Sequence, residues 1–394
     1  KSPIRIFVAA VELVGYFVFS FIQIQGFGIV LSSITGISYN ICCVAFMIIL
    51  IFTCMGGFES VARTDTANAI LILIGVIAGA VTVMHLTGGI GNIVENFVTT
   101  TAPAIEGQPA LEAGVLGSSW GVFGVSAIIS TFLSNAFGSI VAPHWVARFM
   151  APKNAKTAAL QMFCVLLLLI PVFGCLIIIG MGGKMILPTL PVGVTTDYMF
   201  PQLIMNYLNP VLGALALTAI CAAAVSTANS MLLHCSTSLV YDIKRVLQDK
   251  KASAENDDKT TKELRMWVLL LGVLAVLGAI AQFSLLAQGF TYVYGAFGSM
   301  FFAPILFGLF VKRMNQPAAW TSMIVGLIAY LYCTICGAPL GLPTFIVSAG
   351  LSVISAIIVM NVTKKPPVET YEAFFFDEVS EETLRTIHKI RKDI

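Results

Sequence analysis

Residues 211–243 read VLGALALTAICAAAVSTANSMLLHCSTSLVYDI. This stretch is apolar enough and long enough to cross a bilayer, which takes about 20 residues. Its middle nevertheless carries four polar side chains at a depth where lipid offers no hydrogen-bond partner: Ser226, Thr227, Asn229 and Ser230. The small residues just before them allow another backbone to approach closely. The stretch therefore predicts a membrane-spanning helix with a polar site at mid-depth.

Two interpretations of this polar cluster follow from its chemistry. Hydroxyl and carbonyl oxygens suit hard cations such as Na⁺, which favours an oxygen-lined ion site. Serine and threonine in membrane helices also commonly bond back to a carbonyl in the preceding turn, and such a bond needs no ion. The sequence leaves both interpretations open for Ser226 and Thr227.

Composition places the whole chain in the membrane. Of 394 residues, 58% are apolar and 11% charged, and the mean hydropathy is +0.92. An ordinary soluble domain has about a quarter of its residues charged. Most of the nine cysteines lie within apolar runs, where cysteine behaves as a small apolar residue, so we expect no disulfide and no metal other than sodium.

The apolar runs are continuous rather than alternating, which predicts helices and not a barrel. We expect an all-α polytopic protein with about ten spans. They cover residues 4–30, 39–58, 67–86, 118–142, 157–182, 210–240, 266–287, 290–311, 318–337 and 344–361.

Basic residues predict the orientation of these spans. With the N-terminus inside, 21 of the 22 Lys and Arg residues fall in inner segments, and Lys184 alone falls outside. This bias predicts that both termini of this chain are cytoplasmic. We expect a multi-pass protein of the plasma membrane. Residues 363–394 are expected to form a cytoplasmic tail with a short amphipathic helix.

A few other polar residues lie inside the predicted spans. Intramembrane ionisable groups cost about 2.5 to 3.5 kcal/mol, so Glu12 is expected to face a cavity or a partner, unless it reaches the interface. Gln23 shares a helix face with Phe19, and a plain interhelical hydrogen bond would also explain it.

Glycine and proline interrupt two of the spans. The fourth span has Asn135 and Ser139 around a break at Gly138 and Pro143, and a broken helix in a transporter is a pointer to the binding site. The eighth span has Gly295, Gly298 and Pro304 next to Tyr294, which indicates either a hinged gate or close helix packing.

Four strings resemble motifs of the sodium:solute symporter family. They are GGFESVARTDTANAILILIG (56–75), APHWVARFMAPKN (142–154), AAAVSTANSMLLHCSTSLVYDI (222–243) and YGAFGSMFFAPILFGLF (294–310). The resemblance covers residues 1–362 and implies a leucine-transporter-type inverted-repeat core. The first span resembles the third core helix of the family, so the resemblance implies a transmembrane domain truncated at its N-terminus, in a natural protein longer by two or three helices.

The resemblance also implies site residues. The family's second sodium site corresponds here to the hydroxyls of Ser226 and Thr227 and the carbonyl of Ala223. Asp65 corresponds to an aspartate on the cytoplasmic side of the sodium path. From the residues alone, Asp65 could equally be an acid at a helix start, where the dipole favours it. Asn68 stands where the family has a glutamine, which departs from the pattern.

The substrate is expected to be a small organic solute. Proline carriers of the family have aromatics eight and four residues before the proline of the second motif and a tyrosine in the third core helix. Here these places hold Asn135, Ser139 and Phe19, which resembles the pantothenate branch. With Gln23 and Tyr294 these residues form the expected substrate site.

Sodium-driven uptake of a carboxylate such as pantothenate is therefore the predicted function. The alternatives are a sodium/proline or other amino acid symporter, and a proton-coupled carrier of the same fold with Glu12 as its proton site. An enzyme is not expected, because the four histidines lie on separate segments with no Asp or Cys at useful spacing. The predicted partners are the solute, Na⁺ and the lipid bilayer, with no cofactor and no nucleic acid.

Overall fold

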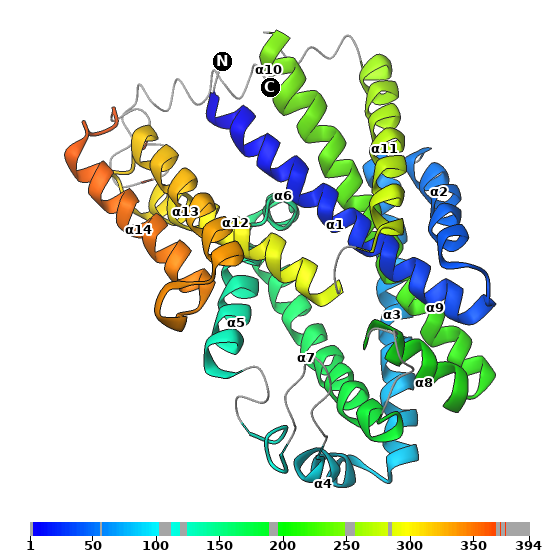
Figure 1. Ribbon diagram of the computed structural model, residues 1–394. Helices are drawn as coiled ribbons and strands as arrows, with labels where there is room; N and C mark the ends of the chain where they lie inside the picture. The colour runs from blue at the N-terminus through cyan, green and yellow to red at the C-terminus, as the bar shows by residue number, and fades with distance from the viewer. Residues whose placement is uncertain are drawn as a thin grey trace. The chain divides into compact units, whose positions relative to one another are not determined.

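The computed structural model describes residues 3–55, 57–101, 112–118, 124–188, 196–248, 257–282, 286–367, 371 and 375, and every regular element in these residues is helical (Figure 1). The chain divides into two compact units, which are described separately. The first comprises residues 1–122 and 148–293, and the second residues 123–147 and 294–394. The predicted tail helix lies outside the described residues, and so do residues 249–256 of the charged stretch 247–262.

The first unit is built around α9 (Pro210–Thr237), which continues into the π-helix η2 (Ser238–Lys244) and α10 (Arg245–Gln248). Helix α9 packs against five other helices of this unit (Figure 1). These are α1 (Pro3–Thr35), α2 (Tyr39–Met55), α3 (Gly57–Thr87), α8 (Met199–Tyr207) and α11 (Asp257–Ile280). Helices α4 (Ile90–Thr99) and α7 (Ala155–Ile186) and the turn η1 (Thr196–Tyr198) complete the unit.

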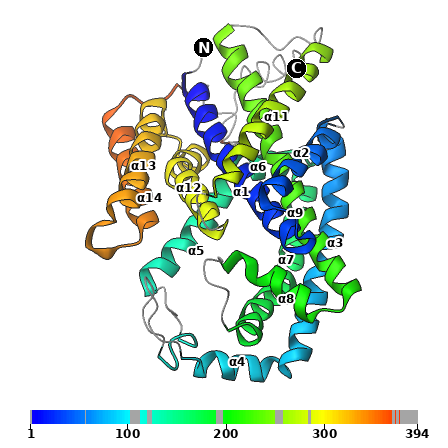
Figure 2. The ribbon, with the colours of Figure 1, turned by 45° about the vertical axis from the view of Figure 1, so that its right-hand side comes forward.

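The second unit contains α5 (Gly124–Val141), α13 (Gln316–Cys336), η4 (Pro339–Gly341) and α14 (Thr344–Val362). Most of α6 (Pro143–Met150) and of α12 (Leu286–Phe310) also belongs to it. Helices α13 and α14 lie side by side (Figure 2). Between α14 and its neighbours, the hydroxyls of Ser299 and Ser348 are 2.7 Å apart, and the Ser352 hydroxyl donates to the Ser322 carbonyl at 2.9 Å.

Asparagines cap three of the long helices, α7, α9 and α13. The Asn209 side chain accepts from the Val211 N–H at 2.9 Å, next to Pro210 in the first turn of α9. Asn154 caps α7 and Asn315 caps α13 in the same way, at 2.8 and 3.0 Å. Such caps satisfy amide groups that have no intrahelical partner.

The predicted spans are found with shifted ends. In the described residues, nine helices are long and apolar enough to cross a membrane. The tenth predicted span is α2, which has 17 residues, at the lower end of the spanning range. Of the interruption expected at Gly138 and Pro143, only the break at Pro143 is confirmed: α5 continues through Gly138 and ends at Val141, and α6 begins at Pro143.

Charged side chains within each unit join helix ends that the distribution of basic residues predicts to lie on the same side of the membrane. In the first unit, Arg5 at the start of α1 pairs with Asp242 at 2.7 Å, and Lys244 pairs with Glu263 near the start of α11. In the second unit, Arg313 donates to the carbonyls of Met360 and Asn361 at the end of α14, each at 2.8 Å.

Candidate functional site

The three predicted sodium ligands lie together on α9. The hydroxyls of Ser226 and Thr227 both donate to the Ala223 carbonyl, at 3.1 and 2.9 Å. All three residues are half-buried, so this face of α9 is not closed by packing within the described residues. The back-bonded conformation that the sequence left open is therefore the one observed.

Back-bonding does not by itself remove these hydroxyls as ligands. A hydroxyl has one donor hydrogen and two acceptor lone pairs. When the hydrogen points to Ala223, the lone pairs of Ser226 and Thr227 remain available to a cation. The Ala223 carbonyl already accepts both hydroxyl hydrogens, so in this conformation Ser226 and Thr227 supply the oxygens left for a hard cation such as Na⁺.

The remaining polar residues of the cluster are more deeply buried than the hydroxyl pair. Asn229 and Ser230 are 6% and 5% exposed. The Ser230 hydroxyl accepts a hydrogen bond from the Arg148 guanidinium at 3.3 Å. In the part of the chain that the structure describes, the side-chain oxygen of Asn229 has no hydrogen-bond partner.

Asp65 does not lie at a helix start, and the prediction of an acid favoured there by the dipole is wrong. Helix α3 begins at Gly57, so Asp65 lies two turns inside it. Its carboxylate Oδ2 pairs with Arg148 at 3.4 Å, while Oδ1 is buried and has no hydrogen-bond partner among the described residues. Arg148 thereby links Asp65 on α3 to Ser230 on α9.

Sequence reasoning missed the role of Arg148. Its partners are 83 and 82 residues away, and no periodicity connects them. One signal was present in the sequence: Arg148 belongs to the second family-like string, residues 142–154. That resemblance does not indicate which residue Arg148 contacts.

Two of the predicted substrate residues lie on α1 in the first unit. Phe19 is only 4% exposed, and its ring lies 4.7 Å from that of Phe290, which makes it a core packing residue. Gln23 lies one turn further along α1 and is half-buried. The interhelical hydrogen bond considered for Gln23 is not recorded among the described residues.

The other three predicted substrate residues lie at one helix crossing in the second unit. Asn135 and Ser139 flank Gly138 on α5, and a Cβ on Gly138 would overlap the carbonyl group of Tyr294 on α12. The Asn135 side-chain nitrogen donates to the Thr131 carbonyl at 2.8 Å, and this bond does not use the side-chain oxygen of Asn135. The Tyr294 ring lies 6.3 Å from that of His144.

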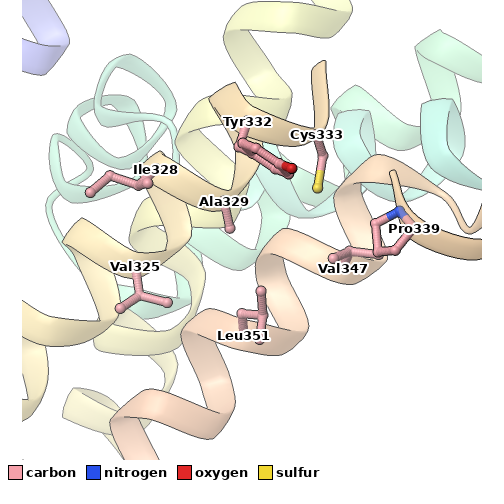
Figure 3. A pocket seen from close by; sticks show the side chains of 8 residues that line it. All are labelled: Val325, Ile328, Ala329, Tyr332, Cys333, Pro339, Val347 and Leu351. Carbon is pink, nitrogen blue, oxygen red and sulfur yellow. The ribbon is translucent and has the colours of Figure 1, made fainter. Parts of the chain in front are cut away.

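The second unit also has a groove of about 370 Å³ between α13 and α14 (Figure 3). Figure 3 shows Val325, Ile328 and Ala329 on one side and Val347 and Leu351 on the other. None of the predicted substrate residues lines this groove, and its walls are apolar apart from Tyr332 and Cys333. It is therefore not the candidate solute site.

Comparison with known proteins gives several relatives. The chain is 26% identical to the sodium/pantothenate symporter of Haemophilus influenzae over 323 residues, which cover 82% of this chain and 64% of that protein. It is 27% identical to the osmoregulated proline transporter OpuE of Bacillus subtilis over 331 residues, which cover 83% of this chain and 64% of that protein. The chain thus spans just under two thirds of the length of these curated relatives.

A solved structure has a similar fold. It is the substrate-bound, outward-open state of a Na⁺-coupled sialic acid symporter, described as revealing a novel Na⁺ site. The TM-score is 0.70 at 21% identity, over 90% of this chain and 74% of the other. At that identity the likeness concerns the fold alone, and it agrees with the all-α symporter core expected from the sequence.

The model of one protein family matches residues 1–326, which is most of the chain. The matched region contains α9, the Asp65–Arg148 pair and the crossing at Gly138. The chain belongs to the sodium:solute symporter family.

Proposed function

We propose that the protein couples inward sodium movement to the uptake of a small organic carboxylate, with pantothenate as the first candidate. The observation that carries this proposal is the meeting of three oxygens on a half-buried face of a spanning helix. The Ser226 and Thr227 hydroxyls both lie within hydrogen-bond distance of the Ala223 carbonyl. Family membership supports sodium as the coupling ion.

The proposed mechanism is alternating access. Sodium held by α9 favours one conformation, and solute binding in that conformation favours its closure. Coupling requires only that both ligands stabilise the same state, and the linkage is then reciprocal. Asp65 and Arg148 lie next to this helix, which is compatible with the role proposed for Asp65 on the sodium path.

Pantothenate is preferred on the chemistry of the α5–α12 crossing. Asn135 and Ser139 offer an amide and a hydroxyl beside the Tyr294 backbone, and such groups suit a hydroxylated, amide-bearing solute. The similarity to sodium/pantothenate symporters supports this choice. The second candidate is proline or another amino acid, which the similarity to proline transporters favours.

We also propose that the protein lies in the plasma membrane with both ends of this chain cytoplasmic. The support is the distribution of basic residues and the agreement of helix ends within each unit.

The test is solute counterflow in proteoliposomes containing the full-length protein. Labelled pantothenate, proline and a sugar are compared with and without sodium. Sodium-dependent exchange of pantothenate alone supports the proposal, exchange of proline alone moves the assignment to the second candidate, and exchange that ignores sodium overturns the coupling.

The sodium site is tested with Ser226→Ala combined with Thr227→Val. Each variant removes a hydroxyl oxygen, so the sodium concentration needed for half-maximal uptake should rise by roughly tenfold or more, as expected for about 1.4 kcal/mol of lost binding. Thr218→Val is the matched control. Thr218 lies on the same helix and also bonds back, to the Ala214 carbonyl at 2.7 Å, but is exposed near the other end. An equal sodium requirement in the double variant and the control contradicts the site.

A further inference from the structure

A row of polar residues runs along α9 and η2 at intervals of four. It consists of Ser226, Ser230, His234, Ser238 and Asp242. Residues four apart are neighbours on a helix surface. The last four members each meet a polar partner, so the row is a continuous polar contact rather than isolated hydroxyls.

The centre of this row is a contact between Glu12 on α1 and His234 on α9. The carboxylate oxygen Oε1 lies 3.9 Å from the imidazole Nδ1, and the two side chains are 11% and 25% exposed. The Ser238 hydroxyl also hydrogen-bonds the Glu12 carboxyl group. The Tyr16 ring lies 5.6 Å from the imidazole. Glu12 therefore ends in an interhelical contact.

The other charged groups nearby are already engaged. Arg5 pairs with Asp242 at 2.7 Å. Arg148 is hydrogen-bonded to Asp65 and Ser230, and its positive charge opposes a positive charge on His234. On α11, Glu263 pairs with Lys244.

Tyr16 and Cys235 are the remaining titratable groups at this contact, and the Cys235 thiol approaches the Leu13 carbonyl at 3.6 Å. Among the described residues, no lysine or arginine is recorded in ion-pair contact with Glu12. His234 is thus the partner that can balance a charge on Glu12.

Charge balance then requires a proton at this contact. With one proton shared between carboxylate and imidazole, the pair is neutral overall, as an acid with a neutral ring or as an ion pair. Without it, a negative charge is left between two spanning helices, which is costly at that depth. Coupled groups of this kind titrate as a pair and not as separate residues.

We propose that Glu12 and His234 form a binding site for one exchangeable proton, and that its occupancy controls how α1 packs against α9. The proton acts as a ligand of the helix contact and does not replace sodium as the coupling ion. The route to solvent follows the row to the Arg5–Asp242 pair, whose side chains are 54% and 32% exposed. Arg5 precedes Glu12 by seven residues on α1, which is about 10 Å.

The π-helix supports this site. The wider turns of η2 begin at Ser238, immediately after the last turn of α9 that carries His234. π-Turns inside helices occur frequently at functional sites. Here the turn carries both Ser238, which bonds Glu12, and Asp242, which pairs with Arg5.

The test uses purified full-length protein and measures its thermal unfolding midpoint from pH 5 to pH 9. Glu12→Gln keeps the size and hydrogen-bonding groups but cannot bind the proton. The midpoint difference between wild type and Glu12→Gln should change with pH, by up to a tenfold change in the folding equilibrium per pH unit for one linked proton. Glu95→Gln is the matched control, because Glu95 is an exposed acid on α4. The midpoint difference between this variant and wild type should stay constant with pH.

Two further variants separate titration from structure. His234→Gln should remove the pH dependence of the unfolding midpoint over the same pH range as Glu12→Gln. The double variant should change the midpoint little more than either single variant, because both substitutions remove one shared site. If Glu12→Gln does not accumulate as folded protein, His234→Gln carries the test. A midpoint difference that stays constant with pH for both single variants overturns the proposal.

This readout does not depend on the transported solute or on sodium. If the double variant at Ser226 and Thr227 has no effect on sodium dependence while the profiles at Glu12 and His234 behave as expected, only the sodium proposal fails. If instead the double variant at Ser226 and Thr227 raises the sodium requirement while the midpoint differences at Glu12 and His234 stay constant with pH, only the proton-site proposal fails.

Discussion

Replacing Gly138 by alanine should destabilise the second unit. A Cβ at this position would lie 2.7 Å from the carbonyl carbon of Tyr294 and 2.9 Å from its Cβ, and would overlap its carbonyl oxygen. The crossing is tight from the other side as well, because a Cβ on Gly298 would lie 3.0 Å from the Gly138 nitrogen. Backbone atoms cannot move aside as the end of a flexible side chain can.

The expected magnitude comes from two opposing effects. Overpacking of this kind costs about 1–3 kcal/mol, whereas replacing glycine by alanine inside a helix gains up to about 1 kcal/mol. Gly174→Ala on α7 isolates the second effect, because nothing lies within 4 Å of a Cβ there. The two variants should therefore differ by about 1–3 kcal/mol in unfolding free energy.

The assay is equilibrium unfolding of the purified protein in detergent, together with solute uptake. Asn135 and Ser139 flank Gly138, so Gly138→Ala should also raise the solute KM, while Gly174→Ala should not. Unfolding free energies that agree within about 0.5 kcal/mol for the two variants would refute the argument that backbone contact fixes this crossing.

Three further changes test other contacts by thermal unfolding. Ser352→Ala removes a bond from α14 to the Ser322 carbonyl and should cost about 0.6–1.7 kcal/mol, whereas Ser355→Ala removes only a bond within α14 and should cost less. Arg148→Lys should lose the bridge between Asp65 and Ser230, because an ammonium cannot reproduce the guanidinium fork, and adding Asp65→Asn should then change the midpoint little. Burial raises the pKa of Asp197 above its ordinary value despite the hydrogen bond from the Leu286 N–H, so wild type should lose stability as pH rises through that raised pKa. Asp197→Asn should remove this loss and match wild type at pH values below the ordinary pKa of the acid, and a wild-type midpoint that rises over the same interval would contradict it.

Hydropathy predicts the membrane part of each helix and not its full length. The prediction began the third span at residue 67, whereas α3 begins at Gly57. The intervening residues include Arg63 and Asp65, which a membrane criterion excludes although they extend the same helix. For the same reason the short helices α4 and α8 were not predicted, because they lie in segments too polar or too short to span.

Local spacing predicted one part of the candidate site and could not predict another. Ala223, Ser226 and Thr227 lie within one helical turn, so any helix brings their oxygens together. Arg148 and Glu12 reach their partners across more than 80 and more than 200 residues, and such contacts depend on packing that no sequence period encodes. The predicted role of Phe19 in solute binding remains a prediction, and its contact with Phe290 is a packing contact.

The π-helix at the end of α9 decides how one end of the first unit responds to a change in chain length. A π-turn holds more residues than an α-turn, so the loss of one codon between Ser238 and Asp242 can be absorbed by a return to α-helical turns. The gain of a codon has no such outlet and would turn Asp242 and Lys244 away from Arg5 and Glu263 together, so the starts of α1 and α11 would lose their anchor in one step. Deletions in this heptapeptide are therefore more tolerable than insertions.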